Sequence, residues 1–169
     1  PEIGVAATKT FIAQVLTGAC LALSGLSVSS RADAMALDGD LRALAATPEA
    51  LSAALDTWRG PAAKMAAEFV NAPGFLFIGR GSGLVYAAEG ALKLKELSYR
   101  WTEHQPAGEL KHGPLALVDA GTPVFVVDNG DSRLDVDVAE VLARGGRVLR
   151  VGERVLNVGG IPLHLPRTG

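Results

Sequence analysis

Three charged residues in one predicted helix are spaced so that their side chains can lie together. Glu89, Lys93 and Glu96 stand at positions i, i+4 and i+7, so their side chains share one helix face. A carboxylate beside an ammonium group can move a proton while the ammonium balances the charge that develops. The same spacing is common in surface ion pairs, each of which contributes about 0.3 kcal/mol. By spacing alone, a solvated ion-pair stripe is the stronger interpretation.

A glycine-rich segment, residues 79–83 (GRGSG), follows a short apolar run and precedes a predicted helix. Backbone amides and a hydroxyl at a helix N-terminus can bind an anion. The segment lacks the third glycine of a dinucleotide fingerprint and no P-loop lysine follows it, so nucleotide binding is not supported. A tight turn between strand and helix explains the glycines equally well.

His112 lies in residues 108–118 (GELKHGPLALV), between Lys111 and a Gly-Pro pair. The Gly-Pro pair should end any short helix and leave His112 on an exposed turn, where loops often carry function. A lone histidine is more often structural or simply solvated. His104 and His164 have no comparable setting, and the three histidines show no metal-ligand spacing, so we expect no metal and no cofactor.

Covalent catalysis and membrane insertion both lack support. The sequence has no Gly-x-Ser-x-Gly elbow, and Cys20, its only cysteine, is expected to be buried in a helix, where a thiolate is disfavoured. The apolar run around Cys20, residues 11–28, is interrupted by polar residues such as Gln14 and Ser24. We therefore expect a buried helix here and no membrane association.

The elements that must position these residues alternate between helix and strand. A helix is predicted over residues 8–28, and a second over 48–70, with Thr47 as its cap, Pro48 in its first turn and possible irregularity at 60–61. Later helices are predicted over residues 84–99 and 132–144. Strands are predicted over residues 75–78, 101–104, 123–128, 147–151 and 161–165. This alternation predicts an α/β fold of the flavodoxin-like type, with a parallel sheet covered by helices on both faces.

Composition and charge narrow the class of protein. The chain has 169 residues, of which 49% are hydrophobic and 20% charged, as in a soluble folded domain. Its net charge of −2 provides no basic field for nucleic acid. The single cysteine gives no sign of an oxidising compartment, which favours the cytoplasm.

Three stretches together resemble the sugar-isomerase (SIS) region of the glucosamine-6-phosphate synthase family. Residues 2–10 (EIGVAATKT) are similar to the segment leading into the second SIS lobe. Residues 89–96 (EGALKLKE) resemble the catalytic helix, and residues 107–117 (AGELKHGPLAL) resemble the histidine loop. With the glycine loop they occur in family order, and the similarity extends over residues 2–151. The family joins ammonia from glutamine to fructose 6-phosphate and isomerises the product to glucosamine 6-phosphate.

The resemblance implies a role for each matching residue. Glu96 would be the carboxylate that moves a proton between C1 and C2, close to the sugar and partly shielded from water. Lys93 would place positive charge near the developing enediolate. His112 would assist ring opening from a neighbouring subunit, which implies a homodimer. Val5 would contact the sugar through its backbone, whereas Ala7 replaces the usual family serine and loses one side-chain hydrogen bond.

The resemblance also predicts how the chain is organised. We expect residues 1–30 to lead in from a first SIS lobe outside this sequence, and residues 31–169 to form the second lobe without the family's C-terminal tail. The phosphate-binding loop, the tail's lysine and the glutaminase belong to those other parts. We therefore expect the chain by itself to be an incomplete enzyme that binds sugar phosphate weakly.

Two alternatives remain open at this level. An SIS-type glucosamine-6-phosphate deaminase would share the catalytic helix and need no glutaminase, although residues 108–112 follow the synthase pattern closely. A non-catalytic SIS module that senses sugar phosphate would not need both Glu96 and His112.

Overall fold

The computed structural model describes residues 3–29 and 33–152, and the backbone of 161–164. Contacts divide the chain into two units, one ending at Thr57 and the other beginning at Trp58. We describe each unit by itself.

The first unit contains helix α1 (Lys9–Ser27), which confirms the predicted helix but not its burial. None of its residues is buried, and large apolar side chains such as Leu21 and Leu26 are exposed. Cys20 is exposed as well, contrary to expectation. By length and composition α1 could cross a membrane, a test that a signal sequence or the core helix of a soluble protein also passes.

Helix α2 (Ala34–Glu68) is continuous, so the predicted start at Pro48 is wrong. Thr47 does not cap a new helix; its hydroxyl donates a 3.2 Å hydrogen bond to the carbonyl of Ala43, inside the same helix. A proline within a helix removes one N–H donor. Pro48 adjoins exposed turns, where water can solvate the carbonyl that lacks a partner.

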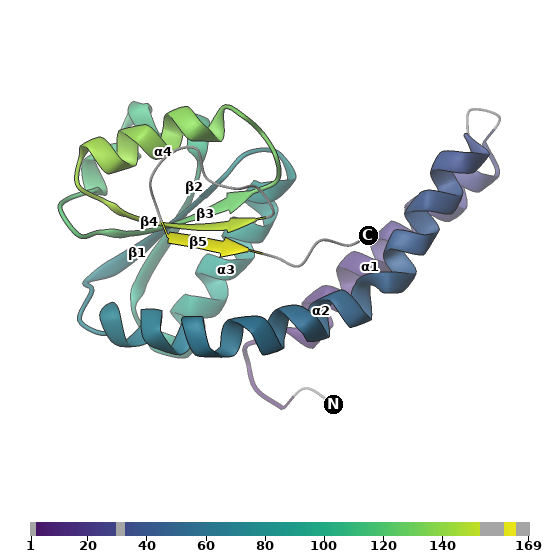
Figure 1. The fold of residues 1–169 in the computed structure, drawn as a ribbon, viewed down its shortest axis with the longest axis horizontal. Helices are drawn as coiled ribbons and strands as arrows, with labels where there is room; N and C mark the ends of the chain where they lie inside the picture. The colour runs from purple at the N-terminus through teal and green to yellow at the C-terminus, as the bar shows by residue number, and fades with distance from the viewer. Residues whose placement is uncertain (1–2, 30–32, 153–160, 165–169) are drawn as a thin grey trace. The chain divides into compact units, whose positions relative to one another are not determined.

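The second unit is built on a parallel sheet, as predicted (Figure 1). Its strands are β1 (Gly74–Gly79), β2 (Trp101–Pro106), β3 (Pro123–Asp128), β4 (Arg147–Gly152) and β5 (Ile161–His164). They lie in the order β2-β1-β3-β4-β5, and every neighbouring pair is parallel. This is the flavodoxin-like strand order.

Helices cover both faces of the sheet (Figure 1). Side chains alternate between faces along each strand, so Ile78 and Val126 point to one layer while Phe77 and Phe125 point to the other. The first layer is closed by helix α4 (Leu134–Ala143), the short helices η1 (Ala107–His112) and η2 (Pro114–Leu117), and nearby apolar residues. The second layer is closed by helix α3 (Ser82–Ser98) and by the end of α2. Each fully buried aliphatic or aromatic side chain contributes about 1.5–3 kcal/mol.

Candidate functional site

The last turns of α3 bring Glu89, Lys93 and Glu96 together. The Lys93 ammonium lies 2.8 Å from a carboxylate oxygen of Glu96 and 3.4 Å from one of Glu89. The three side chains are 18–27% exposed, whereas the surface pair Arg42–Asp38 is 79% and 58% exposed. Their spacing therefore produces a mostly buried charge cluster and not a solvated stripe.

Electrostatics keep Lys93 protonated. The hydrogen bond to Glu96 is the main cause that raises the pKa of the Lys93 ammonium, and attraction to Glu89 adds to it, against a smaller desolvation penalty. A lysine with a raised pKa carries its full charge at neutral pH. It can therefore stabilise negative charge that develops on a bound molecule.

His112 ends the short helix η1, which follows β2. Ala107 and Leu110 are buried and anchor this helix, but the His112 side chain is 74% exposed, as predicted. Its Nε2 atom lies 3.8 Å from a carboxylate oxygen of Glu109, too far for a hydrogen bond. The backbone of η1 therefore sets the position of His112 more than its contact with Glu109 does.

Glu96 and His112 lie toward opposite ends of the strands: Glu96 toward their amino ends and His112 toward their carboxyl ends. Helix α3 begins after the carboxyl end of β1 and runs back across the sheet, so Glu96 lies about 21 Å along the helix axis from Ser82. Strand β2 then carries the chain about 16 Å in the other direction before η1 begins. One chain therefore does not bring these two predicted site residues together.

The glycine loop behaves as a tight turn. A Cβ atom added at Gly79 would lie 2.5 Å from the backbone of Gly83, and one added at Gly83 would lie 2.8 Å from the Val127 carbonyl oxygen. The Ser82 hydroxyl accepts a 3.2 Å hydrogen bond from the amide of Asn129. Close backbone packing explains two of these glycines without an anion.

Arg80, in the middle of this loop, had no role predicted from the sequence. Its guanidinium donates hydrogen bonds of 2.7 and 3.0 Å to the buried carboxylate of Asp137 in α4. This pair raises the pKa of Arg80. A charged residue between two glycines was the only local signal, and it did not identify a partner 57 positions away.

Val5 and Ala7 precede α1 and belong to the first unit. The Val5 side chain is 91% exposed. Their part in a substrate site therefore remains a prediction.

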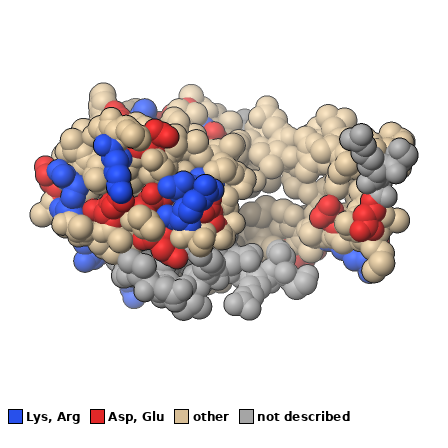
Figure 2. Space-filling model, turned by 90° about the horizontal axis from the view of Figure 1, so that it is seen from above, with Lys and Arg blue, Asp and Glu red and all other residues tan. Residues whose placement is uncertain are grey.

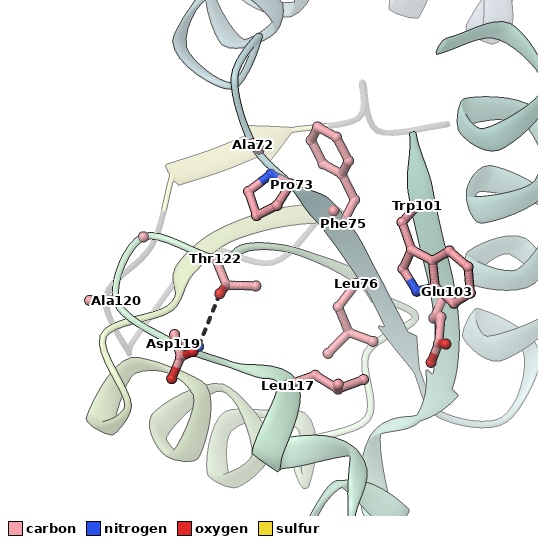
Figure 3. Close-up of a pocket in the computed structure, with 12 residues that line it drawn as sticks. Ala72, Pro73, Phe75, Leu76, Trp101, Glu103, Leu117, Asp119, Ala120 and Thr122 are labelled. Carbon is pink, nitrogen blue, oxygen red and sulfur yellow. Dashed lines mark hydrogen bonds between the residues drawn. The ribbon is translucent and has the colours of Figure 1, made fainter. Parts of the chain in front are cut away.

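Neither of the two described cavities is lined by a predicted site residue. One, of about 370 Å³, lies at the amino edge of the sheet, where the beginnings of β1 and β2 and the loop before β3 meet (Figure 3). Trp101, Glu103 and Leu117 line it. The other, of about 570 Å³, is mostly apolar and lies between the end of α2, α3 and the sheet. Within the described ranges, no group of His, Cys, Asp or Glu could hold a metal ion.

Charges of both signs are interleaved on the surface of the sheet unit (Figure 2). Two of the pairs are Lys111 with Glu140, at 2.6 Å, and Arg133 with Asp131, at 2.6 Å. The face shown carries no extended basic patch, in line with the low net charge.

The chain is similar in sequence to known enzymes. The chain is 43% identical over 155 residues to the glutamine–fructose-6-phosphate aminotransferase [isomerizing] of Aquifex aeolicus, which covers 90% of this chain and 25% of the relative. It is 44% identical over 149 residues to the enzyme of the same name from Pyrobaculum aerophilum, covering 86% and 24%. The chain thus spans about a quarter of the length of these relatives.

Two solved structures have a fold similar to that of this chain. The C-terminal domain of glucosamine-fructose-6-phosphate aminotransferase from Francisella tularensis aligns with a TM-score of 0.80 and 37% identity, over 98% of this chain and 49% of that one. A putative phosphosugar isomerase from Silicibacter pomeroyi aligns with a TM-score of 0.76 and 30% identity, over 95% and 46%. The SIS domain family matches residues 68–152, half of the chain, which include β1 to β4, Glu96 and His112. The chain therefore belongs to the SIS domain family.

Proposed function

We propose that this chain is the second SIS lobe of the isomerase region of a glutamine–fructose-6-phosphate aminotransferase, with residues 1–30 leading in from a first lobe. In the complete protein it binds fructose 6-phosphate and glucosamine 6-phosphate and takes part in their isomerisation. The observation that carries this proposal is the mostly buried pair of Lys93 and Glu96 in a chain whose relatives bear that enzyme's name. We also propose that it works in amino-sugar metabolism, as the relatives' name suggests, and in the cytoplasm, the compartment that its single cysteine favours.

Glu96 is the proposed base. Its carboxylate takes the proton from one of the two sugar carbons, C1 and C2, and returns it to the other. The enediolate-like intermediate between these steps carries negative charge on oxygen or nitrogen. Lys93 lies one turn earlier on the helix and stays protonated, so it stabilises that charge.

We propose that His112 acts on the substrate held by a partner subunit and assists ring opening there. The separation of Glu96 and His112 at opposite ends of the strands supports this arrangement. It makes the working unit a homodimer with two shared sites. Backbone groups around Val5 and Ala7 would supply further sugar contacts.

The test uses the complete protein that carries this chain. Glu96→Gln keeps the size of the side chain and removes the base, so turnover of fructose 6-phosphate with glutamine should fall by about 10²–10⁴-fold while the protein stays folded. Glu68→Gln is the matched control, because Glu68 also pairs with a cation but lies on another helix. Unchanged turnover in Glu96→Gln would remove Glu96 from the mechanism. Ammonia release from glucosamine 6-phosphate without any use of glutamine would identify a deaminase instead.

A further inference from the structure

Gly108 packs directly against the guanidinium group of Arg80. A Cβ atom at Gly108 would lie 2.9 Å from Nη1, 3.0 Å from Nη2 and 3.1 Å from Cζ of Arg80. Real side chains do not approach this closely, so only glycine fits while Arg80 keeps its position. The contact joins the glycine loop after β1 to the histidine loop after β2.

Arg80 cannot easily move aside. Two hydrogen bonds fix its guanidinium on Asp137, and the Asp137 side chain is only 6% exposed. Paired bonds of this kind between guanidinium and carboxylate set the orientation of the plane as well as its position. Moving Arg80 would leave a buried carboxylate without its cation.

The same helix holds the histidine loop at a second point. Glu140 lies three positions after Asp137 in α4 and accepts a 2.6 Å bond from Lys111, the neighbour of His112. Between the two attachments, Leu110 is fully buried in the core. Helix η1 is therefore attached at Gly108, Leu110 and Lys111, and His112 follows the last of them.

We propose that Arg80 is a positioning residue for His112: fixed by Asp137, it supports Gly108 and so sets the path of η1. The proposal rests on the proposed role of His112 in ring opening. Proton transfer at a ring oxygen requires a tightly held donor, since a displacement of about 1 Å can lower a rate about 10²-fold. This proposal assigns a function to Arg80, in residues 79–83, that does not involve anion binding.

Two substitutions disturb this support in different ways. Arg80→Lys keeps the positive charge near Asp137 but removes the planar guanidinium that Gly108 contacts. Gly108→Ala keeps the pair of Arg80 and Asp137 but introduces a Cβ that forces η1 and the guanidinium apart. Arg133→Lys is the matched control, because Arg133 lies near the same edge of the sheet but pairs with Asp131 and has a 72% exposed side chain.

The experiment compares two substrates of the complete protein. Fructose 6-phosphate must open its ring, whereas 5-deoxyfructose 6-phosphate has no C5 hydroxyl and cannot close one. Arg80→Lys and Gly108→Ala should lower kcat/KM for fructose 6-phosphate by about 10–100-fold and leave that for the deoxy compound within about twofold. His112→Ala should show the same pattern, and combining it with Arg80→Lys should add little. Equal losses on both substrates, or no loss on either, would overturn the proposal.

A second measurement separates this proposal from the role of His112. Amide hydrogen exchange in residues 107–113 should be faster in Arg80→Lys than in the wild type or Arg133→Lys, while α4 keeps its protection. Unchanged exchange in this segment overturns the positioning role. If exchange rises but His112→Ala treats both substrates alike, Arg80 does position the loop and the proposed ring-opening role is what fails.

Discussion

The ammonium of Lys93 donates a 2.8 Å hydrogen bond to the carboxylate of Glu96 from the preceding turn of the same helix. Both side chains are partly buried, so water screens this pair less than it screens a fully exposed pair. Replacing Lys93 with Met should therefore lower kcat of the complete enzyme by about 10²–10³-fold with a smaller change in KM, because the charge is needed most in the transition state. Lys64→Met, on the exposed face of α2, should have no effect. Steady-state kinetics measure both, and an unchanged kcat in Lys93→Met would contradict the role.

Glu96 and His112 should complement each other between subunits. After subunit exchange between Glu96→Gln and His112→Ala proteins, about half of the dimers are mixed, and each mixed dimer has one intact site, so activity should approach about one quarter of wild type. Mass spectrometry of differently labelled subunits checks that exchange has occurred. Exchange without recovered activity would place both residues in a site within one subunit.

Gly90 should resist substitution although it lies inside a helix. A Cβ there would lie 2.9 Å from the ring of Phe77, which stacks on Phe125 with ring centroids 4.5 Å apart. We expect Gly90→Ala to destabilise the protein by about 1–3 kcal/mol through overpacking, against a gain in helix propensity of about 1 kcal/mol. Urea unfolding measures the difference.

Gly39→Ala is the matched substitution for Gly90→Ala. Gly39 lies in α2 with nothing within 4 Å of the added Cβ. It should leave stability unchanged or raise it by up to about 1 kcal/mol. Equal effects at the two positions would mean that the contact with Phe77 is easily relieved.

Arg150 should be among the most sensitive charged residues for stability. Its side chain is 3% exposed and bonds to Asp128, which is 1% exposed, and to Asp135 at 2.7 Å. Arg150→Met leaves Asp128 buried without its cation, so the free energy of unfolding should fall by about 3–5 kcal/mol. Arg42→Met removes an exposed pair and should change it by less than about 1 kcal/mol. A small loss at Arg150 would indicate that water reaches Asp128.

Much of the sheet could be predicted from local patterns. Apolar runs such as residues 75–78 and 123–128 mark buried parallel strands, because such strands are covered on both faces. Helix α2 was harder: Thr47-Pro48 is typical of a helix start, yet the helix continues through it. A proline inside a helix costs a limited amount of free energy, and the favourable interactions of the rest of a long helix can outweigh this cost.

The amino-acid sequence alone identified the candidate catalytic residues: Glu89, Lys93 and Glu96 share a face because a helix repeats every 3.6 residues. It also placed His112 on an exposed turn, since Gly-Pro ends a short helix. The fold, in contrast, places the elements that carry Glu96 and His112 at opposite ends of the strands, and it brings Arg80 into contact with Asp137 and Gly108. Arg80 is 28 residues from Gly108 and 57 residues from Asp137 in the sequence, so these contacts depend on the order of the strands in the sheet. The local spacing of residues does not reveal the strand order, because the packing of the whole core sets that order.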